Sequence, residues 1–316
     1  GGNVLQTSQE APGMVPTFGA VDTENDVAPE VDVAVVIPAY NEEGGVGAIV
    51  TRVRDTLSQL PMSYDVVVVD DGSSDNTALE AEMHGARVIR QEQNRGYGAA
   101  LKRGIQATRS EFVVITDADG TYPPEQISVL LSRAEKQDMV VGARAMTDVS
   151  IPMIRRPAKR FLGALASYLS GHRIPDLNSG LRVMRRSVLM QFLHLLPSGF
   201  SFTSTITLAM LCTGHRVLYL PVTCAPRVGS SKIRARDFSA FCMLVLRTIV
   251  LFNPLKVFLP LGTFLFTIGL IKLLYDVYLW NLSETAVMSF LAAVIVWSVG
   301  LLADMISRLQ LNPPRR

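Results

Sequence analysis

The stretch VAVVIPAYNEE at residues 33–43 decides the fold, because a short and wholly apolar run ends abruptly in polar residues. Three further apolar runs follow along the chain, at residues 66–69, 112–116 and 139–141, and each stops at an Asp or a Gly. Continuous β-branched runs of this length are typical of strands buried on both faces, as in a parallel sheet.

The segments between these runs have helical patterns, at residues 48–60, 74–84, 97–108 and 124–136. This alternation predicts a doubly wound, mostly parallel α/β sheet. Residues 1–30 are rich in Gly, Pro, Glu and Asp without periodicity, so we expect a mobile tail, with a regulatory or partner-binding arm as the alternative.

The C-terminal part of the chain has a different texture. Residues 257–274 and 286–306 are almost uninterrupted apolar runs, each near the roughly 20 residues that cross a bilayer. The short connection between them predicts a transmembrane helical hairpin, with a hairpin buried in a soluble protein as the alternative. Residues 238–252 have an amphipathic pattern that favours a helix in the membrane interface over an ordinary buried helix.

Charge patterning predicts the orientation of this hairpin. Arg and Lys side chains flank the two apolar runs, whereas the turn between them holds Asp276 and Glu284. The positive-inside rule therefore places the α/β domain on the cytoplasmic side of an inner or plasma membrane. We expect a tail at 1–30, a catalytic domain at 31–235, an interfacial helix at 236–256, and a hairpin with a short basic tail at 257–316. The net charge of +2 gives no argument for a nucleic-acid partner.

Acidic clusters follow three of the predicted strands, at residues 38–42, 70–73 and 117–120. In an open α/β sheet, ligands bind beyond the carboxyl ends of the strands. Asp117 and Asp119 share one face of an extended segment, and two hard oxygen ligands can hold Mg²⁺ or Mn²⁺. The alternative for this pair alone is a solvated turn.

These residues resemble glycosyltransferase family 2 of the GT-A type, and in particular the polyprenyl-phosphate hexosyltransferases. That group includes dolichyl-phosphate mannose synthases and GtrB-like enzymes. The stretches that carry the resemblance are IPAYNEE (37–43), VVVDDGSSDNT (67–77), DADGTYPPE (117–125), GAR (142–144), DLNSGLRVMRR (176–186) and RVGSSKIR (227–234).

The resemblance implies a role for each matching position. Asp117 and Asp119 would hold the metal and the donor diphosphate, and Asp119, Asp176 and Arg144 would be the catalytic group. The remaining donor-binding positions would be Pro38, Tyr40, Glu42, Asp70 or Asp71, Ser179, Arg227, Ser231 and Lys232. Arg144, Arg155 and Lys159 would lie near the acceptor phosphate, and a homo-oligomer, such as a tetramer, is expected by the same resemblance.

Two positions depart from the mannose synthases within this family. Thr121 stands where some of them have a Gln that adds a metal ligand, and Thr205 stands where their later helix carries an acidic residue. Sugar recognition is therefore expected to differ. The Gln-x-x-Arg-Trp motif of processive synthases is absent from the sequence.

The chemistry of a phosphate acceptor suits these residues. A phosphate monoester is largely anionic at neutral pH, so the reaction needs cations and alignment more than a general base. Such cations are supplied by Arg155, Arg156, Lys159 and Arg160. The acceptor role is favoured for Arg155 and Lys159, whereas a solvated basic face is an equal alternative for Arg156 and Arg160. Asp176 would orient the sugar or act as a base, or else be a structural carboxylate that caps amides or pairs with Arg182.

The motifs and the resemblance together predict a transferase that moves a hexose from a nucleotide-sugar, foremost a UDP-sugar, onto undecaprenyl or dolichyl phosphate. The resemblance further implies that the reaction is inverting. Its partners would be the donor, the polyprenyl phosphate and membrane lipids. One alternative is a GDP-mannose-dependent mannosyltransferase. A second is a non-catalytic membrane subunit that binds nucleotide-sugar, and a third is a transferase acting on protein or polysaccharide.

Overall fold

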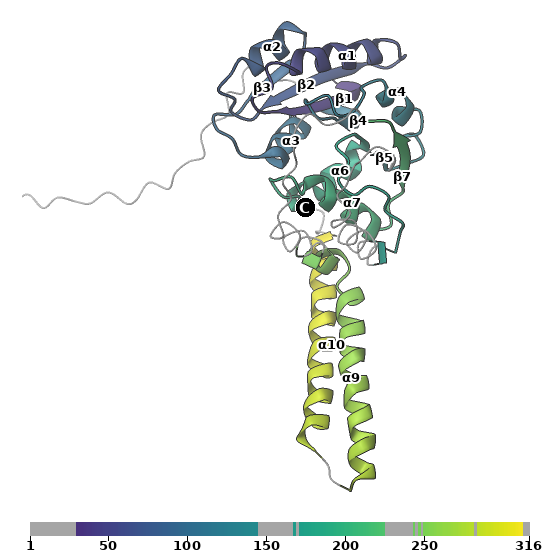
Figure 1. Ribbon diagram of the computed structural model, residues 1–316. Helices are drawn as coiled ribbons and strands as arrows, with labels where there is room; N and C mark the ends of the chain where they lie inside the picture. The colour runs from purple at the N-terminus through teal and green to yellow at the C-terminus, as the bar shows by residue number, and fades with distance from the viewer. Residues whose placement is uncertain are drawn as a thin grey trace, which may run out of the picture.

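The computed structural model describes residues 30–144, 167–168, 171–224, 243, 246–247, 249–280 and 283–311. An α/β domain carries two long helices that project from it side by side (Figure 1). The elements of the first half are β1 (Glu30–Ala39), α1 (Val46–Ser58), β2 (Tyr64–Asp70), α2 (Thr77–Met83), β3 (Arg87–Arg90), α3 (Tyr97–Gln106), β4 (Arg109–Ile115), α4 (Gln126–Leu131) and β5 (Met139–Arg144). Those of the second half are β6 (Arg182–Arg185), α6 (Arg186–Phe192), the 3-10 helix η2 (Leu193–Leu195), α7 (Phe202–Cys212), β7 (Val217–Val222), α9 (Leu255–Tyr278) and α10 (Glu284–Leu311).

The four apolar runs form strands, and the four helical patterns form helices, so these expectations are confirmed. The pattern missed β3, β6 and β7. β3 and β6 each begin and end with Arg, so neither reads as a continuous apolar run. β7 is an apolar run, VLYLPV, but it contains Pro221, a residue that argues against a strand interior.

Seven strands of the described residues form one sheet in the order β3-β2-β1-β4-β6-β5-β7. β1, β2, β3 and β4 are parallel to one another, and β5 is parallel to β7. β6 runs antiparallel to both of its neighbours, β4 and β5. The mostly parallel sheet is therefore confirmed, with one reversed strand near its middle.

The sheet is covered on both faces, because its central strands are apolar on both sides. One core joins alternate residues of β1, β2 and β4 to α1, α2 and α4. The other core joins the intervening residues to α3, α6 and α7. Figure 1 shows α1 and α2 above the sheet and α3 below it.

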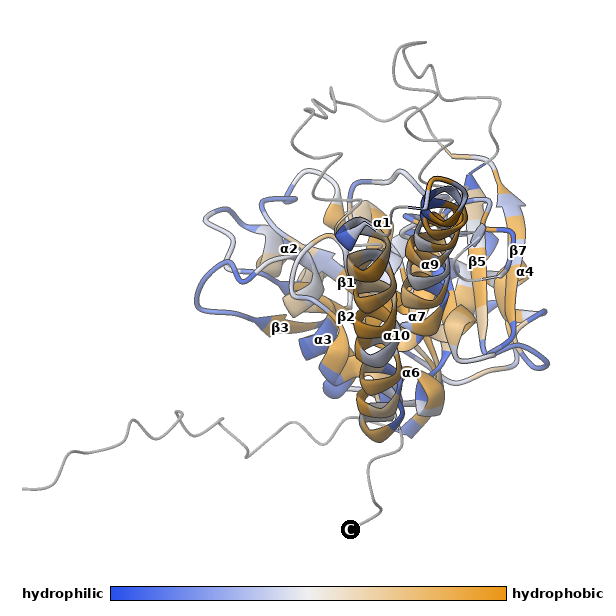
Figure 2. Cartoon of the chain, turned by 90° about the horizontal axis from the view of Figure 1, so that it is seen from below, coloured by the Kyte–Doolittle hydropathy of each residue, from blue (hydrophilic) through white to orange (hydrophobic). Residues whose placement is uncertain are grey.

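Helices α9 and α10 form the predicted hairpin. Both are long and apolar enough to cross a membrane, with mean hydropathies of 2.0 and 2.3, and only 11% and 17% of their apolar windows are buried. Figure 2 shows apolar residues along both helices. Helices this exposed are not the core of a soluble domain, so the alternative of a buried hairpin does not fit.

Glycines form part of the seam between the two helices. A Cβ at Gly300 would lie 2.5 Å from the Cβ of Phe258, and one at Gly262 would clash with the Trp297 ring. Small residues at such positions let helices approach closely. The hairpin is joined to the α/β domain through Ile249 and Phe252, which are buried against it. Of the predicted interfacial helix at 236–256, residues 236–242, 244–245 and 248 lie outside the described residues.

Candidate active site

The candidate site lies at the edge of the sheet where β1, β2 and β4 end. The register places Ala39 of β1 opposite Asp70 of β2, and Val36 opposite Ile115 of β4. Because β6 is antiparallel, the segment that precedes it also reaches this edge. Residues 40–45, 71–76, 116–121 and 176–181 therefore meet at one end of the sheet.

Asp117 is held in place by two neighbours from distant parts of the chain. The hydroxyl of Tyr97, at the start of α3, donates to Asp117 Oδ1 at 2.9 Å. Gly180 lies against Asp117 Oδ2 so closely that a Cβ there would clash with the carboxylate. Burial, followed by the charge of Asp117, raises the pKa of Tyr97 well above its ordinary value, so Tyr97 remains a protonated donor.

Glu42 and Asp119 add negative charge beside Asp117. Burial, followed by the charges of Asp119, Asp75 and Asp117, raises the pKa of Glu42. Oδ1 of Asp119 accepts the backbone N–H of Thr121 at 2.9 Å. No three His, Cys, Asp or Glu side chains among the described residues are placed to hold a metal ion by themselves.

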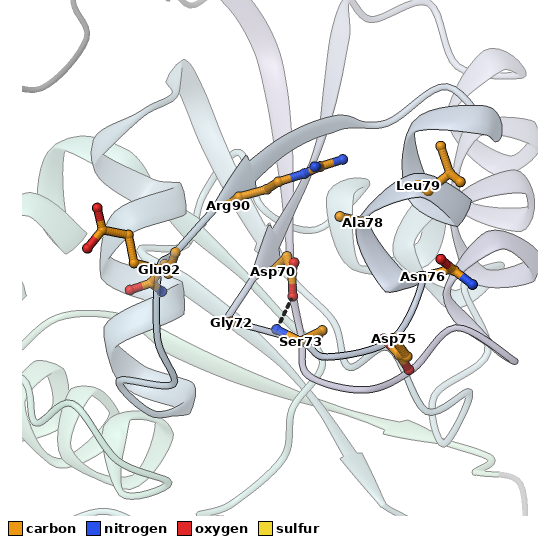
Figure 3. Close-up of a pocket in the computed structure, with 10 residues that line it drawn as sticks. Asp70, Gly72, Ser73, Asp75, Asn76, Ala78, Leu79, Arg90 and Glu92 are labelled. Atoms are coloured by element: carbon orange, nitrogen blue, oxygen red, sulfur yellow. Dashed lines mark hydrogen bonds between the residues drawn. The ribbon is translucent and has the colours of Figure 1, made fainter.

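The structure distinguishes Asp70 from Asp71, which the sequence left open as base contacts. Both oxygens of Asp71 accept backbone N–H groups, of Arg95 and Gly96, each at 2.8 Å. Asp71 therefore shapes the loop before α3. Asp70 accepts the Ser73 N–H at 3.0 Å and lines a cavity of about 310 Å³ (Figure 3).

Arg144 and Asp176 form a two-pronged ion pair. Arg144 Nε donates to Asp176 Oδ2 at 2.8 Å, and Nη2 donates to Oδ1 at 2.9 Å. Burial alone would raise the pKa of Asp176, but the hydrogen bonds and charge of Arg144 outweigh it and lower the pKa below 3.8. The predicted catalytic residues Arg144 and Asp176 are therefore brought together, and a carboxylate held in this way is a poor general base.

The alternative in which Asp176 pairs with Arg182 does not hold, although Asp176 does accept the backbone N–H groups of Arg144 and Asn178. Arg182 is fully buried in β6 and donates to the carbonyls of Ser179 and Leu177 at 2.8 and 2.9 Å, and to the Thr207 hydroxyl. Its guanidinium therefore braces the loop before β6 rather than a carboxylate.

Ser179 and Pro38, two of the predicted donor contacts, are buried where a ligand does not reach them. Ser179 is fully buried and its hydroxyl donates to the Gly142 carbonyl, so as placed it supports the loop and cannot touch a ligand. Pro38 is buried within β1, whereas Tyr40 is 48% exposed and Glu42 is half-buried at the site. Thr205 is buried in α7. The predicted residues Arg155, Lys159, Arg227, Ser231 and Lys232 lie outside the described residues.

The glycines around Tyr97 have a packing reason. A Cβ at Gly96 would lie 2.8 Å from the Ser198 carbonyl oxygen, and one at Gly98 would clash with the Pro197 carbonyl. The 197–199 segment therefore covers the start of α3. The sequence reasoning did not identify Tyr97 as a contact of Asp117, because no local pattern joins residues 20 positions apart.

The fold and this site define a GT-A-type domain with carboxylates at the ends of its strands. The family model for glycosyl transferase family 2 matches residues 34–193, and the model for the GtrB C-terminal hairpin matches residues 253–309. The chain belongs to glycosyl transferase family 2.

Two similar proteins of known activity are transferases that use a polyprenyl phosphate. The chain is 33% identical over 207 residues to a dolichyl-phosphate hexose transferase of Haloferax volcanii, covering 64% of this chain and 86% of the relative. It is 35% identical over 175 residues to an undecaprenyl-phosphate 4-deoxy-4-formamido-L-arabinose transferase of Serratia proteamaculans. That match covers 53% of each protein, so the chain spans about half of this relative.

A solved structure supports the fold alone. Glucosyl-3-phosphoglycerate synthase of Mycobacterium tuberculosis, in complex with Mn²⁺, UDP-glucose and phosphoglyceric acid, matches with a TM-score of 0.54 and 23% identity. The match covers 69% of this chain and 80% of that one.

Proposed function

We propose that this chain transfers a hexose from a nucleotide-sugar, foremost a UDP-sugar, to a polyprenyl phosphate at the cytoplasmic membrane surface. One observation carries the proposal: the carboxylates of Glu42, Asp117 and Asp119 gather at the sheet edge of a family 2 domain that is joined to an exposed apolar hairpin. The first feature suits a nucleotide diphosphate with a cation, and the second suits a lipid acceptor.

The donor would lie across the ends of β1, β2 and β4. Tyr40 and Glu42 would contact the nucleoside, and Asp70 rather than Asp71 would be the base contact, because Asp71 is occupied by two amides. Asp117 and Asp119 would hold Mg²⁺ or Mn²⁺. When bound, this cation would neutralise charge on the diphosphate leaving group.

The residues present fit such a cation. Two carboxylates with donor phosphate oxygens and water are a usual ligand set for Mg²⁺, so a third protein ligand is not required. Burial, followed by the charges of Asp119, Asp75 and Asp117, raises the pKa of Glu42, and a cation would relieve the part that comes from charge. The M. tuberculosis neighbour, which shares this fold, was solved in complex with Mn²⁺ and UDP-glucose, and a cation at Asp117 and Asp119 is consistent with that complex.

The acceptor phosphate needs alignment rather than deprotonation. The low pKa of Asp176 and its ion pair with Arg144 support an orienting role for Asp176 over that of a base. Arg144 would direct the N–H groups that do not bind Asp176 to the phosphate, and Arg155 and Lys159 would bind the same phosphate. Arg227, Ser231 and Lys232 would close over the donor phosphates.

A transfer assay tests the proposal. Detergent-solubilised protein would be mixed with undecaprenyl or dolichyl phosphate, Mn²⁺ or Mg²⁺, and labelled UDP- and GDP-sugars. We expect label in the lipid fraction from a UDP-sugar, lost with Asp119→Ala and on chelation. Transfer from GDP-mannose alone would establish the mannosyltransferase alternative. Donor binding without any transfer would favour the non-catalytic membrane subunit that binds nucleotide-sugar.

A further inference from the structure

The side chain of Asn41 fastens two loops of the site together. The side-chain Oδ1 of Asn41 accepts the backbone N–H of Ser74 at 2.9 Å. The backbone N–H of Asn41 donates to Ser73 Oγ at 2.9 Å. The Ser74 hydroxyl also lies 3.3 Å from the same Oδ1. Asn41 follows β1 and the two serines follow β2, so these bonds extend the pairing of the two strands beyond the sheet.

The backbone of Asn41 has a conformation that most residues avoid. Its φ is +55°, and Trp280 is the one other described non-glycine residue with a positive φ. Asn tolerates this left-handed region better than most residues, but the conformation persists only where the surroundings hold it. Here the bonds to Ser73 and Ser74 hold it.

Neighbouring bonds complete this link between the loops, which we call the loop latch and define as Asn41–Glu43 with Ser73–Thr77. The N–H of Glu42 donates to Thr77 Oγ1 at 2.8 Å, and the N–H of Asn76 donates to Glu43 Oε2 at 2.8 Å. Asn41 stands between Tyr40 and Glu42, so the latch fixes the backbone on both sides of it.

We infer that Asn41 is a positioning residue that sets nucleotide affinity by holding Tyr40 and Glu42 in place. The inference rests on the proposed function, in which these two side chains contact the nucleoside. A loop fixed before binding loses less conformational entropy when the ligand binds. Removal of the latch therefore weakens binding without touching the reacting atoms, and the expected kinetic signature is a higher donor KM with an unchanged kcat.

Three variants separate the side-chain bond from the backbone conformation. Asn41→Gly keeps the left-handed backbone and removes the acceptor, and we expect UDP binding to weaken about fivefold to tenfold. Asn41→Ala also strains the backbone and is expected to bind at least as weakly as Asn41→Gly. Asn41→Asp keeps both the acceptor and the backbone tolerance, and at high salt it should bind within about threefold of the wild type.

Ser63→Ala is the matched control. Ser63 joins the same two strands at the opposite edge of the sheet, where its hydroxyl lies 2.9 Å from the Asp32 nitrogen and 2.8 Å from Asp32 Oδ2. We expect Ser63→Ala to leave UDP affinity and donor KM unchanged.

The measurements are calorimetric titration of the full-length protein with UDP and Mn²⁺, donor KM and kcat, and hydrogen exchange of residues 71–77. Faster exchange in Asn41→Gly together with weaker UDP binding supports the inference. Unchanged UDP binding in Asn41→Gly, or an equal loss in Asn41→Asp or Ser63→Ala, overturns it. A wild-type protein that binds neither UDP nor GDP overturns the proposed function as well.

Discussion

The Tyr97 hydroxyl fixes the direction of the Asp117 carboxylate across 20 residues of sequence. The ring of Tyr97 is itself stacked on Phe200, with ring centroids 5.6 Å apart. At the scale of single residues, the candidate site is therefore organised by side chains that need not touch the ligand.

Tyr97→Phe tests this arrangement. It removes the hydroxyl and keeps the ring, so Asp117 loses one constraint, and we expect the Mn²⁺ concentration for half-maximal transfer to rise about fivefold. Phe200→Leu is the control, because it removes the stacked ring and leaves the hydroxyl. An equal effect of the two changes would show that the hydroxyl has no separate role.

The Arg144–Asp176 ion pair predicts a pH dependence of stability. The folded pKa of Asp176 is lowered from 3.8, so its stabilising contribution is complete above the unfolded pKa and disappears as pH falls through the folded pKa. Asp176→Asn should cost about 2 kcal/mol at neutral pH, and the difference should shrink below pH 3.8. Denaturant unfolding across pH measures it, and a difference that stays constant into acid would contradict it.

Among the elements, the start of α3 depends on close contact with the 197–199 segment. Ala99 N–H donates to the Ser198 carbonyl at 2.9 Å, and Gly98 leaves room for the Pro197 carbonyl. Because Tyr97 is the first residue of α3, this contact also determines where the Asp117 partner lies.

Gly98→Ala is therefore expected to destabilise the domain by about 1–3 kcal/mol, since the added methyl meets backbone that must shift. Gly199→Ala, in the segment that packs on it, has nothing within 4 Å of the added Cβ and should change stability little. Chemical denaturation of both variants provides the comparison. Equal stabilities would show that the contact is loose.

At the scale of the whole molecule, the exposed apolar surface of the hairpin suits lipid, whereas the α/β domain at one end of it suits water (Figure 1). The Asp276 carboxylate near the far end of α9 accepts hydrogen bonds from Lys272 at 2.6 Å and from the Ser283 N–H at 3.0 Å. The bond from Ser283 joins the last turn of α9 to the residue before α10, whereas the Lys272 bond lies within α9.

Gly300→Val tests the hairpin seam. The added side chain would collide with Phe258, so we expect the two helices to separate and the hairpin to lose about 1–3 kcal/mol in SDS unfolding of the micelle-bound protein. Leu301→Val, at a side chain 59% exposed, should have little effect. Equal stabilities of the two variants in SDS would show that α9 and α10 tolerate a wider separation.

The sequence by itself determined the strand–helix alternation, the apolar hairpin, and the gathering of Asp70, Asp117 and Glu42 at one edge. These features follow from local patterns, because hydrophobic period and length report burial and solvent directly. The family was also readable from short motifs within single loops.

The tertiary structure decided what no local pattern contains. It reversed β6, so that the loop before this strand reaches Asp117, and it paired Asp176 with Arg144 instead of Arg182. It assigned Asp71 to backbone amides and placed Tyr97 on Asp117. Each of these contacts joins residues 20 or more positions apart, and their partners are chosen by strand order and packing rather than by the residues beside them.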